Sequence, residues 1–179
     1  YQPRHPMHRA HEVLTKNSGE EVDASLLIHP VVGVTRYGDI DHYTRVRCYK
    51  ALCERYYDPD RTLLNLIPLA VRMAGPRAGL WHGIINRNYG VNYFIIGRDP
   101  HGPGKDSQGQ DFYETRDVQQ LFREHEAEIG VRIIPHKEMV YVPRGNRYEE
   151  SGRAKNGNEQ FITVSATRVI DEALFNGTL

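Results

Sequence analysis

The segment at residues 76–97, PRAGLWHGIINRNYGVNYFIIG, decides the fold class of this sequence. Its amphipathic first part, 76–89, predicts a helix, and Gly90 follows where a glycine commonly ends one. The apolar run at 93–97 is continuous rather than alternating, as in strands that are buried on both faces of a sheet. The segment therefore predicts a helix followed by a buried strand.

The same alternation extends along the chain in both directions. Further apolar runs at 25–29, 63–67 and 131–135 predict strands, and amphipathic stretches at about 7–16, 41–57 and 116–129 predict helices. Alternating strands and helices predict an α/β fold, with a parallel sheet flanked by helices and right-handed crossovers. Two segments, 98–111 and 144–158, are rich in polar residues and glycine, and we expect long loops there.

Composition excludes several classes of protein. The 179 residues suffice for one domain with a core, and 39% hydrophobic with 26% charged residues argue against disorder, collagen and coiled coil. Lys and Arg total 23, as do Asp and Glu, so there is no basic excess for gripping nucleic acid. The longest apolar run, 63–71, is broken by Asn65 and Pro68, which argues against a transmembrane helix.

The start of the chain suggests that it is a fragment, and its cysteines suggest its cellular compartment. A strand is expected before the first helix, but only six residues precede it, so we expect the first strand to be missing and the chain to be a fragment. Cys48 and Cys53 lie five positions apart on one predicted helix, which is unsuited to a disulfide. Reduced thiols and the lack of a targeting signal favour the cytoplasm.

The first motif with chemical content is QPRHPMHRAH at residues 2–11. His8 and His11 would share one face in the first turn of a helix, where free backbone N–H groups attract anions. Arg4 would add a planar donor fork suited to phosphate or sulfate. We expect a polyanion site at the carboxyl edge of the sheet. For the histidine pair alone, a structural role remains open, whereas the zinc pattern with a four-residue spacing and Glu is absent.

Two further motifs follow predicted strands. Residues 97–104, GRDPHGPG, form a glycine-rich turn that lets backbone amides approach a ligand, with Arg98 directed into the same crevice. The alternative is a solvated loop. Residues 162–167, ITVSAT, run from a strand into a final helix, where Ser165 or Thr167 would cap the helix and could also bond a phosphate oxygen. Capping alone is the simpler interpretation.

Taken in this order, the three motifs resemble the catalytic domain of the ATP sulfurylase (sulfate adenylyltransferase) family. That family carries Gln-Thr-Arg-Asn-Pro-x-His-x-x-His, a Gly-Arg-Asp loop and Ile-Ser-Gly-Thr. The intervening stretches LIHPVVG (27–33), GDID (38–41), RMAGPR (72–77) and KEMVY (137–141) resemble it too. Family members are longer, with a β-rich domain before this region and more chain after it. The resemblance implies that residues 1–179 are part of one such catalytic domain.

The resemblance also implies a fold and a reaction. The fold is a Rossmann-like nucleotidyltransferase domain of the HxxH type. The reaction joins ATP and sulfate to form adenosine 5′-phosphosulfate and pyrophosphate, reversibly, with Mg²⁺ carried by ATP and no protein-bound metal. Sulfate has no proton to lose at neutral pH, so a general base is unnecessary, and positioning with electrostatic stabilisation suffices. Partners beyond these small molecules are not implied, except that a homo-oligomer stays open.

The resemblance assigns roles to individual residues. Sulfate would be held by Gln2, Arg4 and the backbone N–H of His101, and adenine would meet backbone groups of Met139 and Val140. The implied catalytic residues are Pro3, Arg4, His5, His8, His11 and Arg98. The implied nucleotide-binding residues are Gln2, Arg4, His5, His8, His11, Gly97, Arg98, Asp99, Pro100, Met139, Val140, Ser165 and Thr167.

Several positions depart from the family pattern. Pro3 replaces Thr and removes a donor and a hydroxyl, and the bulkier His5 replaces Asn. His101 stands where the family has a small residue, and would narrow the oxyanion pocket or add a donor. Ala166 replaces Gly, and Ile170 replaces Arg. Two alternatives therefore stay open: an adenylyltransferase for a phosphate-bearing acceptor, and a domain that binds nucleotide or oxyanion with impaired turnover.

Overall fold

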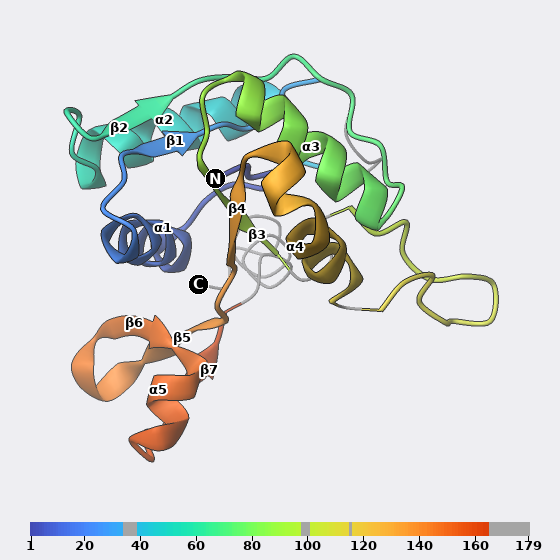
Figure 1. Ribbon diagram of the computed structural model, residues 1–179. Helices are drawn as coiled ribbons and strands as arrows, with labels where there is room; N and C mark the ends of the chain where they lie inside the picture. The colour runs from blue at the N-terminus through green and yellow to red at the C-terminus, as the bar shows by residue number, and fades with distance from the viewer. Residues whose placement is uncertain (34–38, 98–100, 115, 165–179) are drawn as a thin grey trace. The chain divides into compact units, whose positions relative to one another are not determined.

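The computed structural model describes residues 1–33, 39–97, 101–114 and 116–164. The chain divides into two compact units. Figure 1 labels the helices and strands of both. Unit 1 comprises Tyr1–Arg4, Leu27–Asp39 and Leu63–His136, and unit 2 comprises His5–Leu26, Ile40–Thr62 and Lys137–Leu179.

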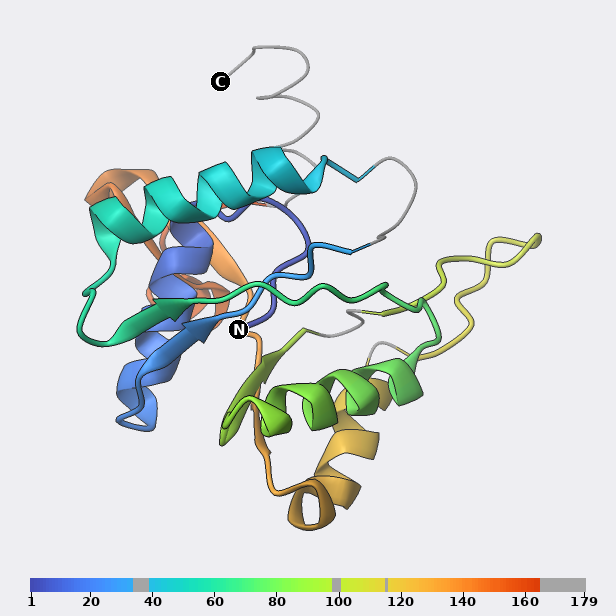
Figure 2. The same cartoon turned by 90° about the horizontal axis from the view of Figure 1, so that it is seen from above.

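Short parallel strands form the sheets of unit 1, and all four lie where apolar runs predicted them. Strands β1 (Leu26–Ile28) and β2 (Thr62–Leu64) form one two-stranded sheet (Figure 2). Strands β3 (Tyr93–Ile96) and β4 (Arg132–Pro135) form another and run parallel. The α/β class with parallel sheets is therefore confirmed.

Two helices, α3 (Pro76–Asn88) and α4 (Asp117–Ile129), pack side by side in unit 1 (Figures 1 and 2). Glycines on α3 allow the close approach, because a Cβ at Gly79 would collide with Val118 and one at Gly83 with the ring of Phe122. Gly130 ends α4 with a φ of 73°, a left-handed conformation that glycine adopts readily. One core cluster of this unit contains Phe94, Ile96, Val118, Phe122 and Val131.

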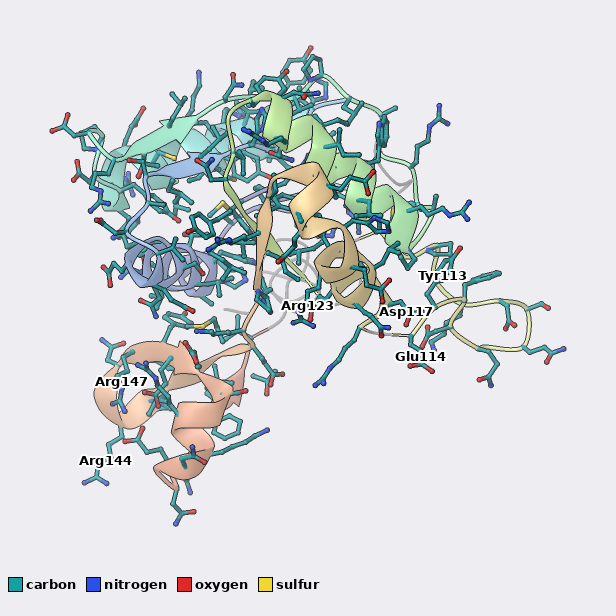
Figure 3. The ribbon with its side chains drawn as sticks, viewed as in Figure 1. Tyr113, Glu114, Asp117, Arg123, Arg144 and Arg147 are labelled. Atoms are coloured by element: carbon teal, nitrogen blue, oxygen red, sulfur yellow. The ribbon has the colours of Figure 1, made fainter. Side chains whose placement is uncertain are left out.

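The turn that leads into α4 is closed by a side chain. Asp117, the first residue of the helix, accepts a hydrogen bond from the backbone N–H of Glu114 at 2.9 Å (Figure 3). The carboxylate also lies where the helix dipole favours a negative charge.

Unit 2 combines two helices with a small antiparallel sheet. Helix α1 spans Arg9–Glu21, and α2 spans His42–Tyr56 with Asp41 as its N-cap, whose carboxylate accepts from the backbone N–H of Thr44 at 2.9 Å. The sheet has the order β6-β5-β7, from Arg147–Glu150, Met139–Val142 and Ile162–Thr163. Apolar residues of α1 pack on it.

The prediction of a long loop at 144–158 is wrong. This segment contains the short 3-10 helix η1 (Pro143–Gly145), strand β6 and helix α5 (Ser151–Asn156). Strand β6 is the polar sequence RYEE, in which Arg147, labelled in Figure 3, forms ion pairs with Glu149 and Glu159. A polar strand held by pairing with β5 carries no apolar run, so its sequence resembles that of a loop.

Helix boundaries agree with the predictions to within two residues at most ends. The exception is α1, which starts at Arg9 and continues to Glu21, beyond the predicted end near residue 16. No helix in the described part of the chain is long and apolar enough to cross a membrane.

Candidate oxyanion and nucleotide site

The first sequence motif is divided between the two units. Gln2 and Arg4 belong to unit 1 and His5, His8 and His11 to unit 2, so the predicted site residues form two sets.

In unit 1, the side chain of Gln2 is held by two residues of α3. Its Oε1 atom lies 3.0 Å from His82 Nδ1 and accepts a longer hydrogen bond, at 3.4 Å, from Asn86 Nδ2. Burial lowers the pKa of His82 to about 4, so the ring is neutral at pH 7. Because an amide oxygen only accepts, the ring's single proton lies on Nδ1.

His101 joins the same group through its ring. Its ring stacks on that of His82, with centroids 4.2 Å apart and planes at 12°. Burial is the main cause that lowers the pKa of His101 to about 3, and electrostatic interaction with His82 and Arg4 lowers it further. The predicted sulfate residues Gln2, Arg4 and His101 therefore lie together, with His82 between Gln2 and His101.

The guanidinium of Arg4 is oriented by two neighbours. Its Nε lies 3.5 Å from Asp39 Oδ2, and its Nη1 lies 3.4 Å from Met73 Sδ. Asp39 and Met73 come from the GDID and RMAGPR stretches, so these stretches supply positioning contacts for the first motif. We call Gln2, Arg4, His82, Asn86 and His101 the oxyanion cluster.

In unit 2, the histidine pair lies at the start of α1, as predicted. His8 is the N-cap residue, and the His8 and His11 rings lie 4.1 Å apart. The backbone N–H of His8 donates to His11 Nδ1 at 3.3 Å, so a neutral His11 carries its proton on Nε2. Burial lowers the pKa of His8. The pair thus adds imidazole groups to a helix end that already favours anions.

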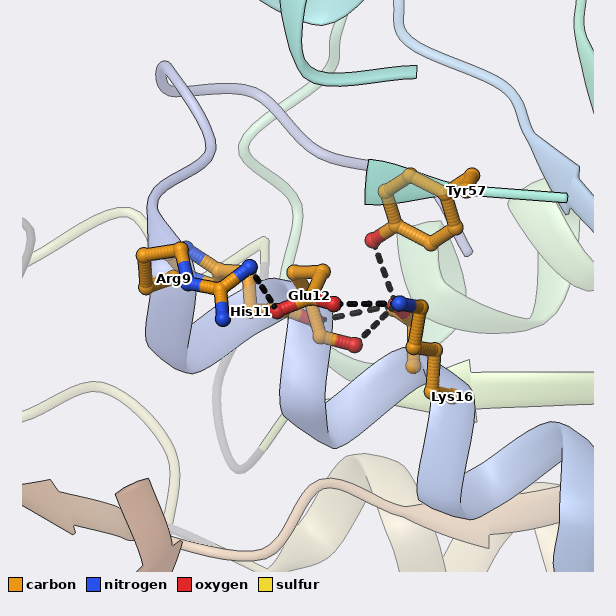
Figure 4. A network of polar contacts seen from close by, with 6 residues as sticks. Arg9, His11, Glu12, Lys16 and Tyr57 are labelled. Carbon is orange, nitrogen blue, oxygen red and sulfur yellow. Dashed lines mark hydrogen bonds and ion pairs between the residues drawn. The ribbon is translucent and has the colours of Figure 1, made fainter. Parts of the chain in front are cut away.

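Contacts behind this pair hold the first turns of α1 (Figure 4). Glu12 is only 3% exposed and forms ion pairs with Arg9 and Lys16. Thr15 Oγ1 lies 2.9 Å from the carbonyl of His11, so its proton is used there and the hydroxyl of Tyr57, 2.7 Å away, donates to it. These contacts fix the helix that carries the histidines.

Comparison with known proteins shows the family of the chain. The family model described as ATP-sulfurylase matches residues 1–178. The chain belongs to the ATP-sulfurylase family. It is 48% identical to the sulfate adenylyltransferase of Schizosaccharomyces pombe and 43% identical to that of Saccharomyces cerevisiae, with 94% of this chain covered in each case. It covers 34% and 33% of those relatives, so it spans about a third of their length.

A solved structure of a hexameric APS kinase from Thiobacillus denitrificans has a similar fold. The TM-score is 0.73 at 29% identity, over 96% of this chain and 30% of that one. The family expected from the three motifs is confirmed, and so is the α/β fold.

Only some of the remaining positions inferred from the ATP-sulfurylase family lie within the described residues. Arg98, Asp99, Pro100, Ser165 and Thr167 lie outside the described residues, as do Ala166 and Ile170. Gly97 follows β3, and its carbonyl accepts from Gln119 Nε2 at 3.3 Å. Pro3 is buried, and the carbonyl of His5 accepts a hydrogen bond from the hydroxyl of Tyr49 at 2.8 Å.

Met139 and Val140 lie on the central strand β5 with buried side chains. The carbonyl of Glu138 accepts from the backbone N–H of Ser151, on the β6 side. Backbone groups of successive strand residues point to opposite neighbours, so those of Val140 point to β6 and those of Met139 to the β7 side. In the register of β5 with β7, Val140 lies opposite Thr163, the last residue of β7, and Met139 lies one position beyond that pair.

The sequence analysis missed His82 and Asn86 of the oxyanion cluster. Both face the same side of α3, four positions apart, and both are almost fully buried. A His and an Asn at that spacing on the apolar face of a predicted helix were the available signal, because a buried polar side chain needs a partner. The identity of that partner, Gln2, depends on tertiary structure.

The two buried histidines predict a pH dependence of stability. Their pKa values, about 4 for His82 and about 3 for His101, lie below the ordinary 6.5, so the unfolded chain binds protons first as the pH falls. The free energy of unfolding is therefore expected to fall between about pH 6.5 and 4, by roughly 1.4 kcal/mol per pH unit for each histidine. Urea unfolding at about pH 7.5, 6 and 5 measures this slope. His101→Ala should reduce the slope, and an unchanged slope would contradict the assignment.

Proposed function

We propose that the protein to which this chain belongs is a sulfate adenylyltransferase that converts ATP and sulfate to adenosine 5′-phosphosulfate and pyrophosphate, reversibly. Family membership supports this, and the observation that carries it is that Gln2 and the His101 ring both contact His82, while the charge of Arg4 acts on His101.

The oxyanion cluster suits a fully charged oxyanion. Arg4 offers a planar fork of N–H donors, and Gln2 offers an amide N–H₂ group. No carboxylate of the described residues reaches Gln2, and Asp39 is paired with Arg4. Sulfate held there needs no proton removed before it attacks. One sulfate oxygen bonds to the α-phosphorus, the bond from that phosphorus to the β-phosphate oxygen breaks, and pyrophosphate leaves.

The histidine pair at the start of α1 suits the phosphates of ATP. We propose that His8 and His11 bind these phosphates together with Arg98, and that Gly97, Asp99, Pro100, Ser165 and Thr167 complete the nucleotide contacts. Backbone groups of Met139 and Val140 would meet adenine. Hydrogen-bond donors directed at the phosphates stabilise the charge that grows on the leaving pyrophosphate.

Magnesium would come with ATP rather than reside on the protein. The described residues include no group of three or more His, Cys, Asp or Glu that could hold a metal ion. The cluster offers imidazole, guanidinium and amide groups, whereas Mg²⁺ prefers oxygen ligands, which the phosphates provide. Bound with ATP, Mg²⁺ would neutralise part of the phosphate charge.

The full-length protein with MgATP tests the proposal directly. Pyrophosphate release should require sulfate or the analogue molybdate, and release that is independent of every oxyanion would refute it. ATP binding in a calorimeter without product over hours would instead favour the second candidate, a binding domain with impaired turnover. The observation that favours this second candidate is the His101 ring, which stacks on His82 in the oxyanion cluster at a position where the family has a small residue. Release stimulated only by phosphorylated acceptors would indicate the other acceptor class.

The proton position on His11 leads to a separate prediction. His11→Leu should raise the KM for ATP roughly 10-fold, because a hydrogen bond to a charged phosphate is lost. His11→Gln should retain much of the affinity, since its amide nitrogen can replace Nε2–H. Initial rates at saturating sulfate provide both KM values. Equal effects of Leu and Gln would show that Nε2–H does not bind the phosphates.

Compartment and assembly are further parts of the proposal. Cys48 and Cys53, both on α2, are free thiols, which supports a reducing cytoplasm. The hexameric relative supports assembly with further copies of the chain. Light scattering of the full-length protein and fractionation of cells would test the two statements.

A further inference from the structure

A chain of hydrogen bonds runs from Gln2 into the interior of unit 1, and one backbone carbonyl sets its direction. Asn86 Nδ2 donates to the carbonyl of His82 at 2.8 Å. A carbonyl only accepts, so the amide of Asn86 cannot be turned around. Its Oδ1 then accepts from His29 Nδ1 at 2.9 Å, and Asn65 Nδ2 donates to His29 Nε2 at 3.2 Å. The donor and acceptor atoms of Asn86 and His29 are thereby assigned.

The same constraint reaches Gln2 from the other side. Both Asn86 Nδ2 and His82 Nδ1 direct protons at Gln2 Oε1. A reversed Gln2 amide would place its N–H₂ group against the N–H₂ group of Asn86. The amide is therefore held with Oε1 toward α3 and Nε2 away from it. Among the described residues, the buried Nε2 atom of Gln2 has no hydrogen-bond partner.

We propose that His82 and Asn86 are positioning residues of the oxyanion subsite, which hold Gln2 so that its N–H₂ group faces the oxyanion beside Arg4. This inference rests on the proposed function and assigns the orientation of its sulfate-binding group. An amide can present either its oxygen or its nitrogen, and only the nitrogen attracts an anion. His82 and Asn86 select the nitrogen without touching the anion themselves.

The buried position of these residues favours this role. His82 is 0% exposed and Asn86 is nearly so, and the ring of His101 covers one face of His82. The side chain of His82 is therefore held in one orientation. Ordered residues such as His82 and Asn86 can keep a binding group such as Gln2 within the narrow range of geometry that binding requires.

Two substitutions of His82 in the full-length protein separate positioning from packing. His82→Leu has a similar size and no donor, and we expect it to raise the KM for sulfate roughly 10-fold with the KM for ATP within about 2-fold. His82→Asn retains an N–H donor near Nδ1 and should restore most of the sulfate affinity. Ile84→Ala, on the exposed side of the same helix, should change neither KM value.

Asn86→Asp is a further variant, at the other positioning residue. It places a carboxylate oxygen against Gln2 Oε1 and the carbonyl of His82, so Gln2 would turn its oxygen toward the subsite. The KM for sulfate should rise at least as much as with His82→Leu. This variant tests the same orientation without altering the histidine, and serves if His82→Leu does not fold.

Sulfate-induced thermal stabilisation provides a readout that does not depend on turnover. If sulfate raises the melting temperature of the unaltered protein but pyrophosphate is not released, the proposed function fails. A smaller sulfate-induced shift in His82→Leu and Asn86→Asp then still supports the inference. If turnover is normal and both variants keep the original KM for sulfate, the inference alone fails. If the unaltered protein shows neither stabilisation nor turnover, both fail.

Discussion

Replacing Arg4 with alanine is expected to lower kcat/KM for sulfate by roughly 100- to 1000-fold. This is the usual effect of removing a hydrogen-bond donor that stabilises a negatively charged oxygen. Arg4 carries the positive charge of the oxyanion cluster, and its charge already acts on His101. Because the substitution acts on sulfate, the dissociation constant for ATP should change by less than about 3-fold. Calorimetric titration of ATP and initial rates at varied sulfate measure the two effects.

Arg4→Lys and Asp39→Asn are the matched controls. Lysine retains the charge but not the planar fork, so most of the loss should persist. Asp39→Asn removes the carboxylate that lies 3.5 Å from Nε while leaving the guanidinium, so its effect should be much smaller. Equal loss of sulfate and ATP binding in Arg4→Ala would contradict a role confined to sulfate, and would show that Arg4 either contacts the nucleotide as well or maintains the fold of the site.

Replacing Phe122 with alanine is expected to destabilise unit 1 by about 3–5 kcal/mol, the range observed when a buried aromatic ring is removed. The ring is 0% exposed and belongs to the core formed by β3, β4 and α4. It also lies against Gly83 of α3, so its loss opens a cavity between the two helices. Hydrogen exchange of α3 and α4 amides in the full-length protein measures the change. Ile84→Ala, at a position 46% exposed, is the control.

The contact between Gly83 and Phe122 can be tested as a pair. Gly83→Ala alone should destabilise by about 1–3 kcal/mol, because its Cβ would collide with the ring. In the Phe122→Leu background the same substitution should cost less, because the ring is gone. Additive effects in this double-mutant cycle would show that the two positions do not pack as described.

Most of the local structure of unit 1 could be predicted from the sequence. Residues 93–96 are apolar without alternation, so burial on both faces was the only way to remove them from water. Gly90 and Gly130 marked the ends of α3 and α4 because glycine adopts positive φ without strain. The polar strand β6 could not be predicted, since its pairing with β5 and the ion pairs of Arg147 replace the apolar signal.

The candidate site likewise contains residues that the sequence indicates and residues that it does not. Gln2, Arg4, His8 and His11 stand close together in one motif, and their chemistry alone indicates an anion. His82 and Asn86 carry no such signal, because their partner Gln2 lies 80 or more positions away in the sequence.

The sequence by itself therefore determined the family and the order of most strands and helices, and it led to the proposal that the first motif binds anions. Each of these depends on residue types and short spacings. Only the tertiary structure decided which side chains support Gln2, how its amide is turned, and that His82 and His101 are neutral. These properties arise from burial and from hydrogen bonds between distant segments, which a linear sequence does not specify.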